Sequence, residues 1–222
     1  MKAGKVRKKV LALLLAGTAI LGLTGGGTMQ VEAAGQENAY VDTSSYEQLY
    51  KLYEDYFKLG IACQAMDHWN DPTAEIGNQE KEELINRMFN SMTFGNELKP
   101  AYNFDASSEN LFKVDFAAEE MLEWAKENNM KVRGHVLVWH SQVDPSIFAI
   151  DYQAYADGKL TKSDTAKLDE ECLVDREELL ARLKRYIYGV LEYTYKNGYA
   201  DVIYAWDVVN EAADENQYDG LR

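Results

Sequence analysis

Apolar strand patterns and helix patterns alternate along this 222-residue chain, and the alternation constrains its fold more than any other feature. Four segments have the pattern of short buried strands: Ile61–Ala65, Ser91–Glu97, Lys131–His140 and Val202–Asn210. Apolar residues at helical spacing separate them, at 84–89, 117–125 and 179–191, and a further helix pattern at 49–57 precedes the first strand. Such alternation is typical of an α/β fold, a parallel sheet with helices outside it.

Both a doubly wound sheet and a (β/α) barrel fit this alternation, and the polar residues favour the barrel. They collect at the carboxyl ends of strands, in the segments 96–99, 139–142 and 210–211. In a barrel all these ends meet on one face, where side chains from separate strands converge on one ligand. The polar excursion at 144–174 leaves the third strand on the same face. It is either a rim loop that shapes a cleft or a solvated insertion.

Glu211 ends the last apolar strand pattern, directly after Asn210. A poorly solvated carboxyl has a raised pKa and stays protonated near neutral pH, so we expect Glu211 to act as a general acid. Cleavage of a glycosidic bond needs such an acid and a second carboxylate across the bond. Asn210 can hydrogen-bond a substrate hydroxyl. The alternative is that Glu211 is only a helix-start residue paired to a nearby base.

Asp207 lies four residues before Glu211, so both side chains point to the same side of a strand. Asp207 sits deeper, among valines, and needs a hydrogen-bonding partner there. His135 on the neighbouring predicted strand is the candidate partner. The alternative for His135 is a core histidine with no role in a site.

The first 33 residues have the pattern of a secretory signal peptide. A basic head at 2–9 precedes an apolar run from Val10 to Leu23, and Val31-Glu32-Ala33 supplies small residues for cleavage. The alternative is a membrane anchor, but the run of about 14 residues is short for a span of roughly 20. We therefore expect a secreted, extracellular protein that is not membrane-bound after cleavage.

Charge and composition exclude several classes of function. The segment 1–33 holds five of the 23 basic residues and one of the 37 acidic residues, so the remainder has a net charge of −18. This charge argues against nucleic acid or an anionic membrane as partner. The sequence has no Cys/His cluster of zinc spacing, no glycine-rich phosphate loop and no nucleophile-elbow serine. We expect the two cysteines, Cys63 and Cys172, to be free thiols.

Three segments resemble glycoside hydrolase family 10, whose typical member is an endo-β-1,4-xylanase. They are SMTFGNELKP at 91–100, RGHVLVWHSQ at 133–142 and WDVVNEA at 206–212. The resemblance runs from Tyr56 to the last residues and implies a (β/α)8 barrel. About the first four strand-helix units are present, so residues 34–222 correspond to the amino-terminal half of the catalytic barrel.

The resemblance also implies roles for individual residues. Glu211 matches the acid/base of a mechanism that retains anomeric configuration, and Asn210 matches a contact to the sugar at the cleavage subsite. His135, Trp139 and Gln142 match residues that line the substrate cleft, and Asn96 and Lys99 match the pair that holds the next sugar. The implied ligand is xylan or a xylo-oligosaccharide, and the implied chemistry uses no metal or organic cofactor.

The sequence departs from the family pattern in three places. Gly95 stands where many members have a glutamate, which removes a sugar contact. Val143-Asp144-Pro145, with Ile147 and Phe148, replaces a Thr-Pro and a nearby tryptophan, so the stacking contact of that tryptophan is not expected.

The third departure is that no glutamate of this chain matches the family nucleophile, which lies on the seventh strand of the barrel. We therefore expect an inactive fragment whose partner is the missing carboxyl-terminal half of the barrel. The alternatives are a different family of retaining barrel glycosidases and a non-catalytic xylan-binding or scaffold remnant.

Overall fold

The computed structural model describes residues 45–65, 73–158, 170–214 and 216. Four strands form one sheet in the order β1-β2-β3-β4, with β1 at Gly60–Cys63, β2 at Ser91–Phe94, β3 at Lys131–Gly134 and β4 at Ile203–Trp206. All three neighbouring pairs are parallel. The predicted alternation is therefore confirmed, and the strand order follows the chain as in a (β/α) barrel.

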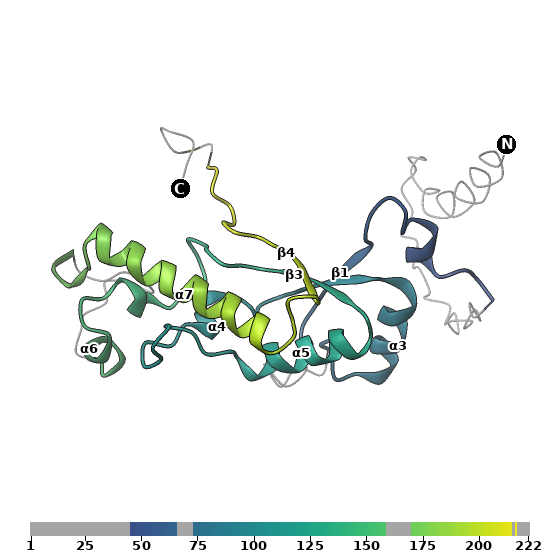
Figure 1. Ribbon diagram of the computed structural model, residues 1–222, viewed down its shortest axis with the longest axis horizontal. Helices are drawn as coiled ribbons and strands as arrows, with labels where there is room; N and C mark the ends of the chain where they lie inside the picture. Colours follow the sequence, from purple (N-terminus) through teal and green to yellow (C-terminus); the bar gives the residue numbers. More distant parts are fainter. Residues whose placement is uncertain (1–44, 66–72, 159–169, 215, 217–222) are drawn as a thin grey trace, which may run out of the picture. The chain divides into compact units, whose positions relative to one another are not determined.

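Three main helices connect the strands: α3 at Gln79–Met88, α5 at Phe116–Glu127 and α7 at Arg176–Lys196 (Figure 1). Each helix is preceded by a capping residue whose side chain accepts a backbone N–H of the first turn. These residues are Asn78, Asp115 and Asp175 respectively. The ends of the last two agree with the sequence. Asn128 caps α5, and Gly198, after α7, adopts a positive φ of 74°.

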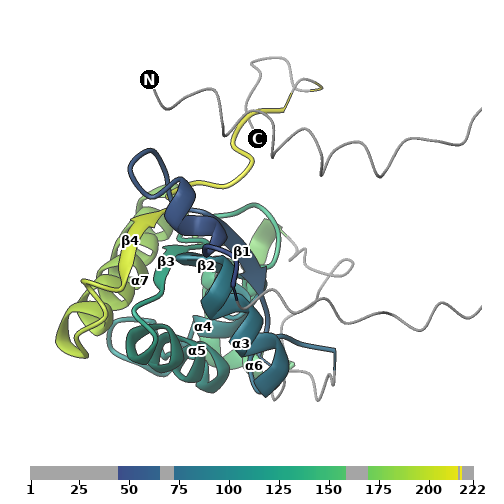
Figure 2. The ribbon, with the colours of Figure 1, turned by 90° about the vertical axis from the view of Figure 1, so that its right-hand side faces the viewer.

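The main helices cover one face of the sheet (Figure 2). Met92, Phe94, Val132 and Cys63 point to the helices and are at most 1% exposed. One hydrogen-bonded row points the other way, and its members are exposed or half-buried: Ala62, Thr93, Arg133 and Ala205. The second face of the sheet, the inner face of a barrel, is therefore open in the described part of the chain.

The two cysteines are free, as predicted. Cys63 lies in the core between the sheet and the helices. Burial, together with the charges of Glu75 and Glu97, raises the pKa of its thiol to about 12. The thiol is therefore protonated and unreactive at neutral pH, which fits a packing role.

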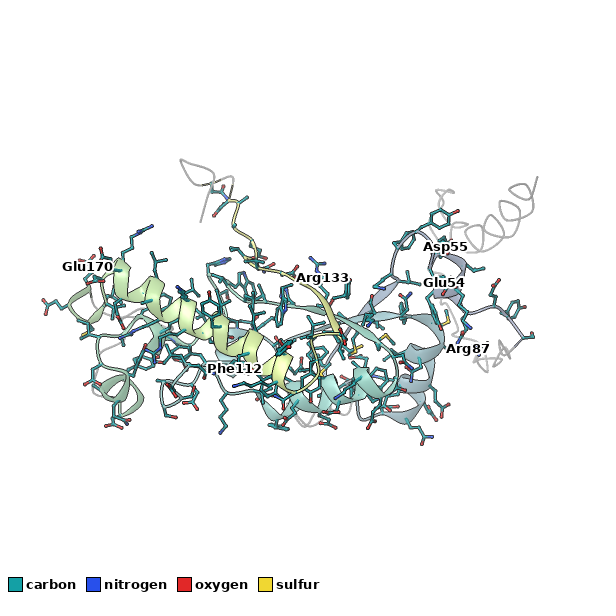
Figure 3. All side chains as sticks on the ribbon, viewed as in Figure 1. Glu54, Asp55, Arg87, Phe112, Arg133 and Glu170 are labelled. Carbon is teal, nitrogen blue, oxygen red and sulfur yellow. The ribbon has the colours of Figure 1, made fainter. Side chains whose placement is uncertain are left out.

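A second apolar cluster lies between α7 and the segment that follows β2. Phe112 lies beside α7 (Figure 3), and a Cβ at Gly189 would be 2.8 Å from the Phe112 Cβ. Tyr186 and Val190 of the same helix are also buried in this cluster. Phe112 can approach α7 this closely because Gly189 has no side chain.

The excursion at 144–174 contains two short helical turns in its first part, η2 at Pro145–Phe148 and α6 at Tyr152–Ala156. The guanidinium of Arg182 on α7 donates to the carbonyls of Ile147 and Ala149, and it is 4% exposed. Ala149 also pairs with Leu173 across the excursion. These contacts favour the rim-loop interpretation over a solvated insertion. Residues 159–169 lie outside the described residues.

Two predictions about the elements are wrong. The pattern at 49–57 forms only a 3-10 turn, η1 at Leu49–Leu52, because most of its apolar surface stays uncovered by the rest of the described chain: Leu52, Tyr56 and Phe57 are 51%, 83% and 53% exposed. The strands are also shorter than their apolar runs. β3 ends at Gly134 and β4 at Trp206, so His135, Asp207 and Glu211 lie beyond the regular ladder.

Within the described residues, no helix combines the length and apolar character that a membrane span requires. The predicted signal peptide at 1–33 lies outside those residues.

Candidate active site

Hydrogen bonds continue between the chain segments that follow β3 and β4, and they bring the site together. Asp207 N–H donates to the Gly134 carbonyl, and Val138 N–H donates to the Val208 carbonyl at 3.0 Å. Asn210 N–H returns a bond to the Val138 carbonyl at 2.9 Å. The two segments therefore run side by side and place residue 139 next to residue 211.

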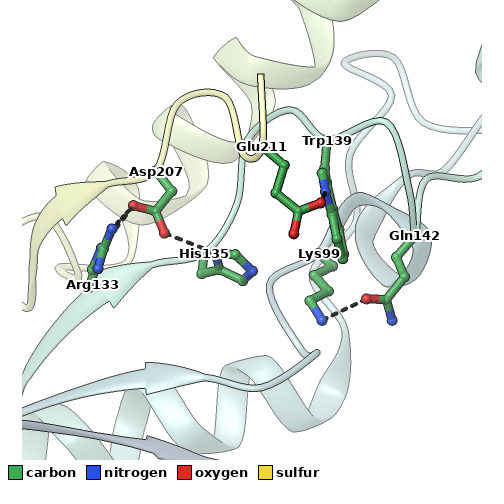
Figure 4. A network of polar contacts seen from close by, with 7 residues as sticks. All are labelled: Lys99, Arg133, His135, Trp139, Gln142, Asp207 and Glu211. Carbon is green, nitrogen blue, oxygen red and sulfur yellow. Dashed lines mark hydrogen bonds and ion pairs between the residues drawn. The ribbon is translucent and has the colours of Figure 1, made fainter. Parts of the chain in front are cut away.

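Glu211 and Trp139 are in direct contact. The indole N–H of Trp139 donates to Oε2 of Glu211 at 3.0 Å (Figure 4). His140 Nε2 lies 3.7 Å from the same oxygen. The Glu211 side chain is 52% exposed, so the poor solvation predicted from its apolar strand is not found among the described residues. The residue lies past the strand end in a turn with φ of 50°, which carries the carboxylate out toward solvent.

Asp207 joins two side chains of the β3 segment. His135 Nδ1 lies 2.9 Å from Oδ2 of Asp207, which confirms the predicted pair. Arg133 binds the other oxygen, with its Nε at 2.8 Å. Burial alone would raise the pKa of Asp207, but the hydrogen bonds from His135 and Arg133 outweigh burial and hold the pKa below its ordinary value. Because the carboxylate is ionised and only accepts, His135 Nδ1 is the donor.

Asn96, Lys99 and Gln142 form a second polar cluster. Lys99 Nζ donates to Asn96 Oδ1 at 2.9 Å and to Gln142 Oε1 at 2.7 Å. Gln142 Nε2 donates to Asn96 Oδ1 at 3.2 Å. Burial lowers the pKa of Lys99, although the nearby Glu97 charge acts in the opposite direction. Lys99 also lies over the Trp139 ring, 5.2 Å from its centroid, which links this cluster to Glu211.

Asn210 is half-buried and lines an apolar pocket of about 300 Å³ together with Trp139 and Glu211. Ile147 and Phe148 line the same pocket, and Ile147 is only 4% exposed. Ile147 and Phe148, which stand where the resemblance implies a tryptophan, therefore line the pocket beside the site.

Two residues of the site were not predicted from the sequence. Arg133 on β3 is a direct partner of Asp207. Glu97 is 0% exposed, and its two oxygens accept the backbone N–H groups of Ala65 at 3.0 Å and Asn96 at 2.9 Å. Glu97 therefore holds the ends of β1 and β2 together, and its carboxylate is not presented to a ligand.

The sequence model of the family described as "Glycosyl hydrolase family 10" matches residues 48–222. The chain belongs to this family. Family 10 enzymes fold as (β/α)8 barrels, and the four parallel strands and their helices form part of such a barrel. The predicted family resemblance and fold class are confirmed, and the alternative of a different barrel family is excluded.

Similar proteins include xylanases from several bacteria. "Endo-1,4-beta-xylanase B" of Butyrivibrio fibrisolvens is 35% identical over 175 residues, which are 75% of this chain and 24% of that protein. "Beta-1,4-xylanase" of Dictyoglomus thermophilum is 30% identical over 217 residues, 97% of this chain and 46% of that protein. The family 10 chain therefore spans less than half the length of these relatives.

Solved structures of family 10 xylanases have the same fold. The xylanase 10B modules of Clostridium thermocellum, complexed with xylohexaose, give a TM-score of 0.61 at 28% identity, over 79% of this chain and 31% of that one. A mutant of an intracellular xylanase of Thermoanaerobacterium saccharolyticum, complexed with xylotetraose, gives a TM-score of 0.59 at 30% identity. The match covers 80% of this chain and 47% of that one.

Proposed function

We propose that the chain supplies the acid/base half of a retaining endo-1,4-β-xylanase site, with Glu211 as the general acid/base. The observation that carries the proposal is the gathering of Glu211, Trp139, His135 and the Lys99–Gln142 pair at one edge of the sheet (Figure 4). Family membership and the oligosaccharide complexes of two relatives support xylan as the substrate.

Glu211 is placed to exchange protons with a ligand. Its half-exposed carboxyl group is accessible to a glycosidic oxygen, and the indole N–H of Trp139 orients it. In the first step Glu211 protonates the departing oxygen, and in the second step its carboxylate deprotonates the water that releases the sugar.

His135 is oriented for a sugar hydroxyl. Its Nδ1–H donates to Asp207, so in the neutral ring Nε2 is an acceptor. Figure 4 shows this second ring nitrogen on the side of Lys99 and Glu211. A hydroxyl that donates to Nε2 would lie next to the bond that Glu211 protonates. Asn210 and the Asn96–Lys99–Gln142 cluster complete the proposed contacts to the sugar chain.

We also propose that the nucleophilic carboxylate comes from protein outside these 222 residues. Three other carboxylates described at this edge are already engaged: Asp207 by Arg133 and His135, Glu97 by two backbone N–H groups, and Glu75 by the backbone N–H of Gln64. A missing carboxyl-terminal half of the barrel is consistent with the share of the relatives that the chain spans. The chain alone would then bind xylo-oligosaccharides without turning them over.

Titration calorimetry with xylohexaose tests the proposed site on the purified chain. The parent chain and an Asn128→Ala control, altered on the surface at the end of α5, should bind equally. Asn96→Ala should weaken binding about tenfold, because it removes hydrogen bonds to both the sugar and Lys99. A parent chain that binds no xylohexaose would contradict the proposal. The alternative of a non-catalytic xylan-binding protein predicts the same binding. Hydrolysis that appears when the missing part of the barrel is supplied separates the two.

We further propose that the protein is secreted after cleavage at residue 33. The basic head and the apolar run at 10–23 support this proposal. Amino-terminal sequencing of protein from the culture medium should begin at residue 34. Retention of the uncleaved chain in the cell would contradict it.

A further inference from the structure

Gly95 stands where the family resemblance implies a glutamate in many members, and the side chain of Gln64 lies beside it. β1 and β2 pair in register through Cys63 and Phe94, and Gly95 N–H donates to the Cys63 carbonyl at 2.8 Å. Gln64 and Gly95 are therefore neighbours just past the last pair of the ladder. Because side chains alternate along a strand, both positions face away from the helices, onto the open inner face of the sheet.

The side chain of Gln64 lies across Gly95. A Cβ built on Gly95 would be 2.8 Å from Gln64 Cγ and 3.0 Å from Gln64 Nε2. These distances are too short for a side chain at position 95 while Gln64 keeps its conformation. The carboxamide of Gln64 thus occupies the space into which a residue-95 side chain would project.

The backbone of Gln64 is held firmly in this position. Its N–H donates to Glu75 Oε2 at 3.1 Å, and its carbonyl accepts the N–H groups of Glu75 and Ile76. Next to it, the buried carboxylate of Glu97 ties Ala65 to Asn96. The hydrogen bonds of Glu97 therefore link the backbone next to Gln64 to the backbone of Asn96 in the Asn96–Lys99 cluster.

We propose that Gln64, directly after β1, is a sugar-binding residue of this chain, whose carboxamide lies where a side chain of residue 95 would project. The ligand group is a pyranose hydroxyl of the sugar that Asn96 and Lys99 hold. A carboxamide both donates and accepts, so it can bind a hydroxyl without a net charge. The inference rests on the proposed function of the same site.

A double-mutant cycle tests the geometry without any ligand. Gly95→Ala should lower the melting temperature of the parent chain, because the added Cβ meets Gln64 Cγ. In a Gln64→Ala background the same substitution should have little effect, because the obstructing atoms are gone. Equal effects of Gly95→Ala in both backgrounds would overturn the proposed placement of Gln64.

Titration with xylotetraose tests the binding role on the purified chain. Gln64→Ala should weaken binding about tenfold, in the range expected for a lost hydrogen bond. Gln64→Glu should bind within a few-fold of the parent, because a carboxylate also accepts from a hydroxyl. Gln79→Ala, an exposed glutamine on α3, is the matched control and should bind like the parent.

The outcomes separate this inference from the proposed function. If the parent binds xylotetraose, Asn96→Ala weakens binding and Gln64→Ala does not, the inference about Gln64 is overturned while the proposed function stands. If the parent does not bind at all, the proposed function fails and this inference fails with it.

Discussion

Glu97, Asp207 and Glu211 are three of the carboxylates at the carboxyl-terminal edge of the sheet, and their surroundings give them different tasks. Glu97 is fully buried and accepts two backbone N–H groups. Asp207 is largely buried between Arg133 and His135, and Glu211 is half-exposed beside Trp139. At the residue scale we therefore assign Glu97 to the fold, Asp207 to the orientation of His135 and Glu211 to proton transfer.

Replacing Glu97 should destabilise the chain. In Glu97→Gln one acceptor oxygen becomes an NH2 group, which leaves a buried backbone N–H without its partner. Such a loss costs about 1–3 kcal/mol. Urea unfolding should show this decrease, whereas Glu83→Gln, at an exposed position of α3, should change stability by less than about 0.5 kcal/mol. Equal stabilities of the two variants would contradict the assignment of Glu97 to the fold.

The Asp207 carboxylate should contribute stability that depends on pH. Its pKa is lowered in the folded chain, so the contribution is present above the unfolded pKa of about 3.9 and is lost as pH falls through the folded value. Urea unfolding should find Asp207→Asn about 2 kcal/mol less stable than the parent at pH 7, with a smaller difference at pH 3. The exposed Asp201→Asn serves as control. A difference that does not change with pH would contradict the role of the ionised pair.

At the scale of elements, α7 supports both the sheet and the rim of the site. Tyr186 and Val190 pack in the second apolar cluster, and Arg182 binds two carbonyls of the excursion. The Arg182 guanidinium also lies 3.9 Å from the centroid of the Tyr152 ring. One buried arginine therefore ties α6 and η2 to the helix.

Replacing Arg182 should loosen the excursion without unfolding the sheet. Arg182→Met keeps apolar volume but removes the donors to Ile147 and Ala149. We expect hydrogen exchange at residues 146–156 to become at least tenfold faster, while residues 91–94 of β2 exchange as in the parent. Lys184→Met, at an exposed position of the same helix, is the control. Unchanged exchange in 146–156 would show that other contacts hold the excursion.

The sequence predicted those elements whose pattern coincides with a packed face. α5 and α7 have apolar stripes that meet the sheet or the second cluster, and their periodicity was sufficient to place them. The pattern at 49–57 has the same periodicity, but its apolar side chains stay largely exposed in the described part of the chain, so it forms only one turn. Local pattern does not encode the partner, and that is where the helix prediction failed.

Some contacts of the site could be predicted from the sequence, and others could not. Asp207–His135 followed from the need of a buried carboxylate for a partner, and the structure confirms that pair. Glu97, Arg133 and Gln64 could not be assigned, because their contacts depend on how neighbouring strands align. Gln64 lies 31 residues before Gly95, and only the register of β1 on β2 brings them together.

At the scale of the whole molecule, the sheet has an open side. Tyr204, Val208 and Val209 on and after β4 are 46%, 58% and 54% exposed, and the inner row of the sheet is uncovered in the described residues. Such apolar surface and an unpaired strand edge favour association. These residues lie where further strands of a barrel would continue.

The purified chain should therefore self-associate. Light scattering during size-exclusion chromatography should show a mass that rises with concentration over the micromolar range. Val208→Lys with Val209→Lys should reduce this association, because two charges would oppose burial of the edge. Leu84→Lys, which alters an equally exposed residue on α3, should leave it unchanged. A parent chain that stays monomeric over this concentration range would contradict the expected association.

The most direct test joins this chain to the part of the Dictyoglomus thermophilum xylanase that lies outside the matched 46%. We predict that the chain alone does not hydrolyse xylan and that the fusion does. In the fusion, Glu211→Ala should lower xylan hydrolysis by about 10²–10⁴-fold. The initial burst of phenolate from a dinitrophenyl xylobioside, whose leaving group needs no protonation, should be much less affected. Xylan hydrolysis by the chain alone, or a fusion whose activity survives Glu211→Ala, would contradict the account.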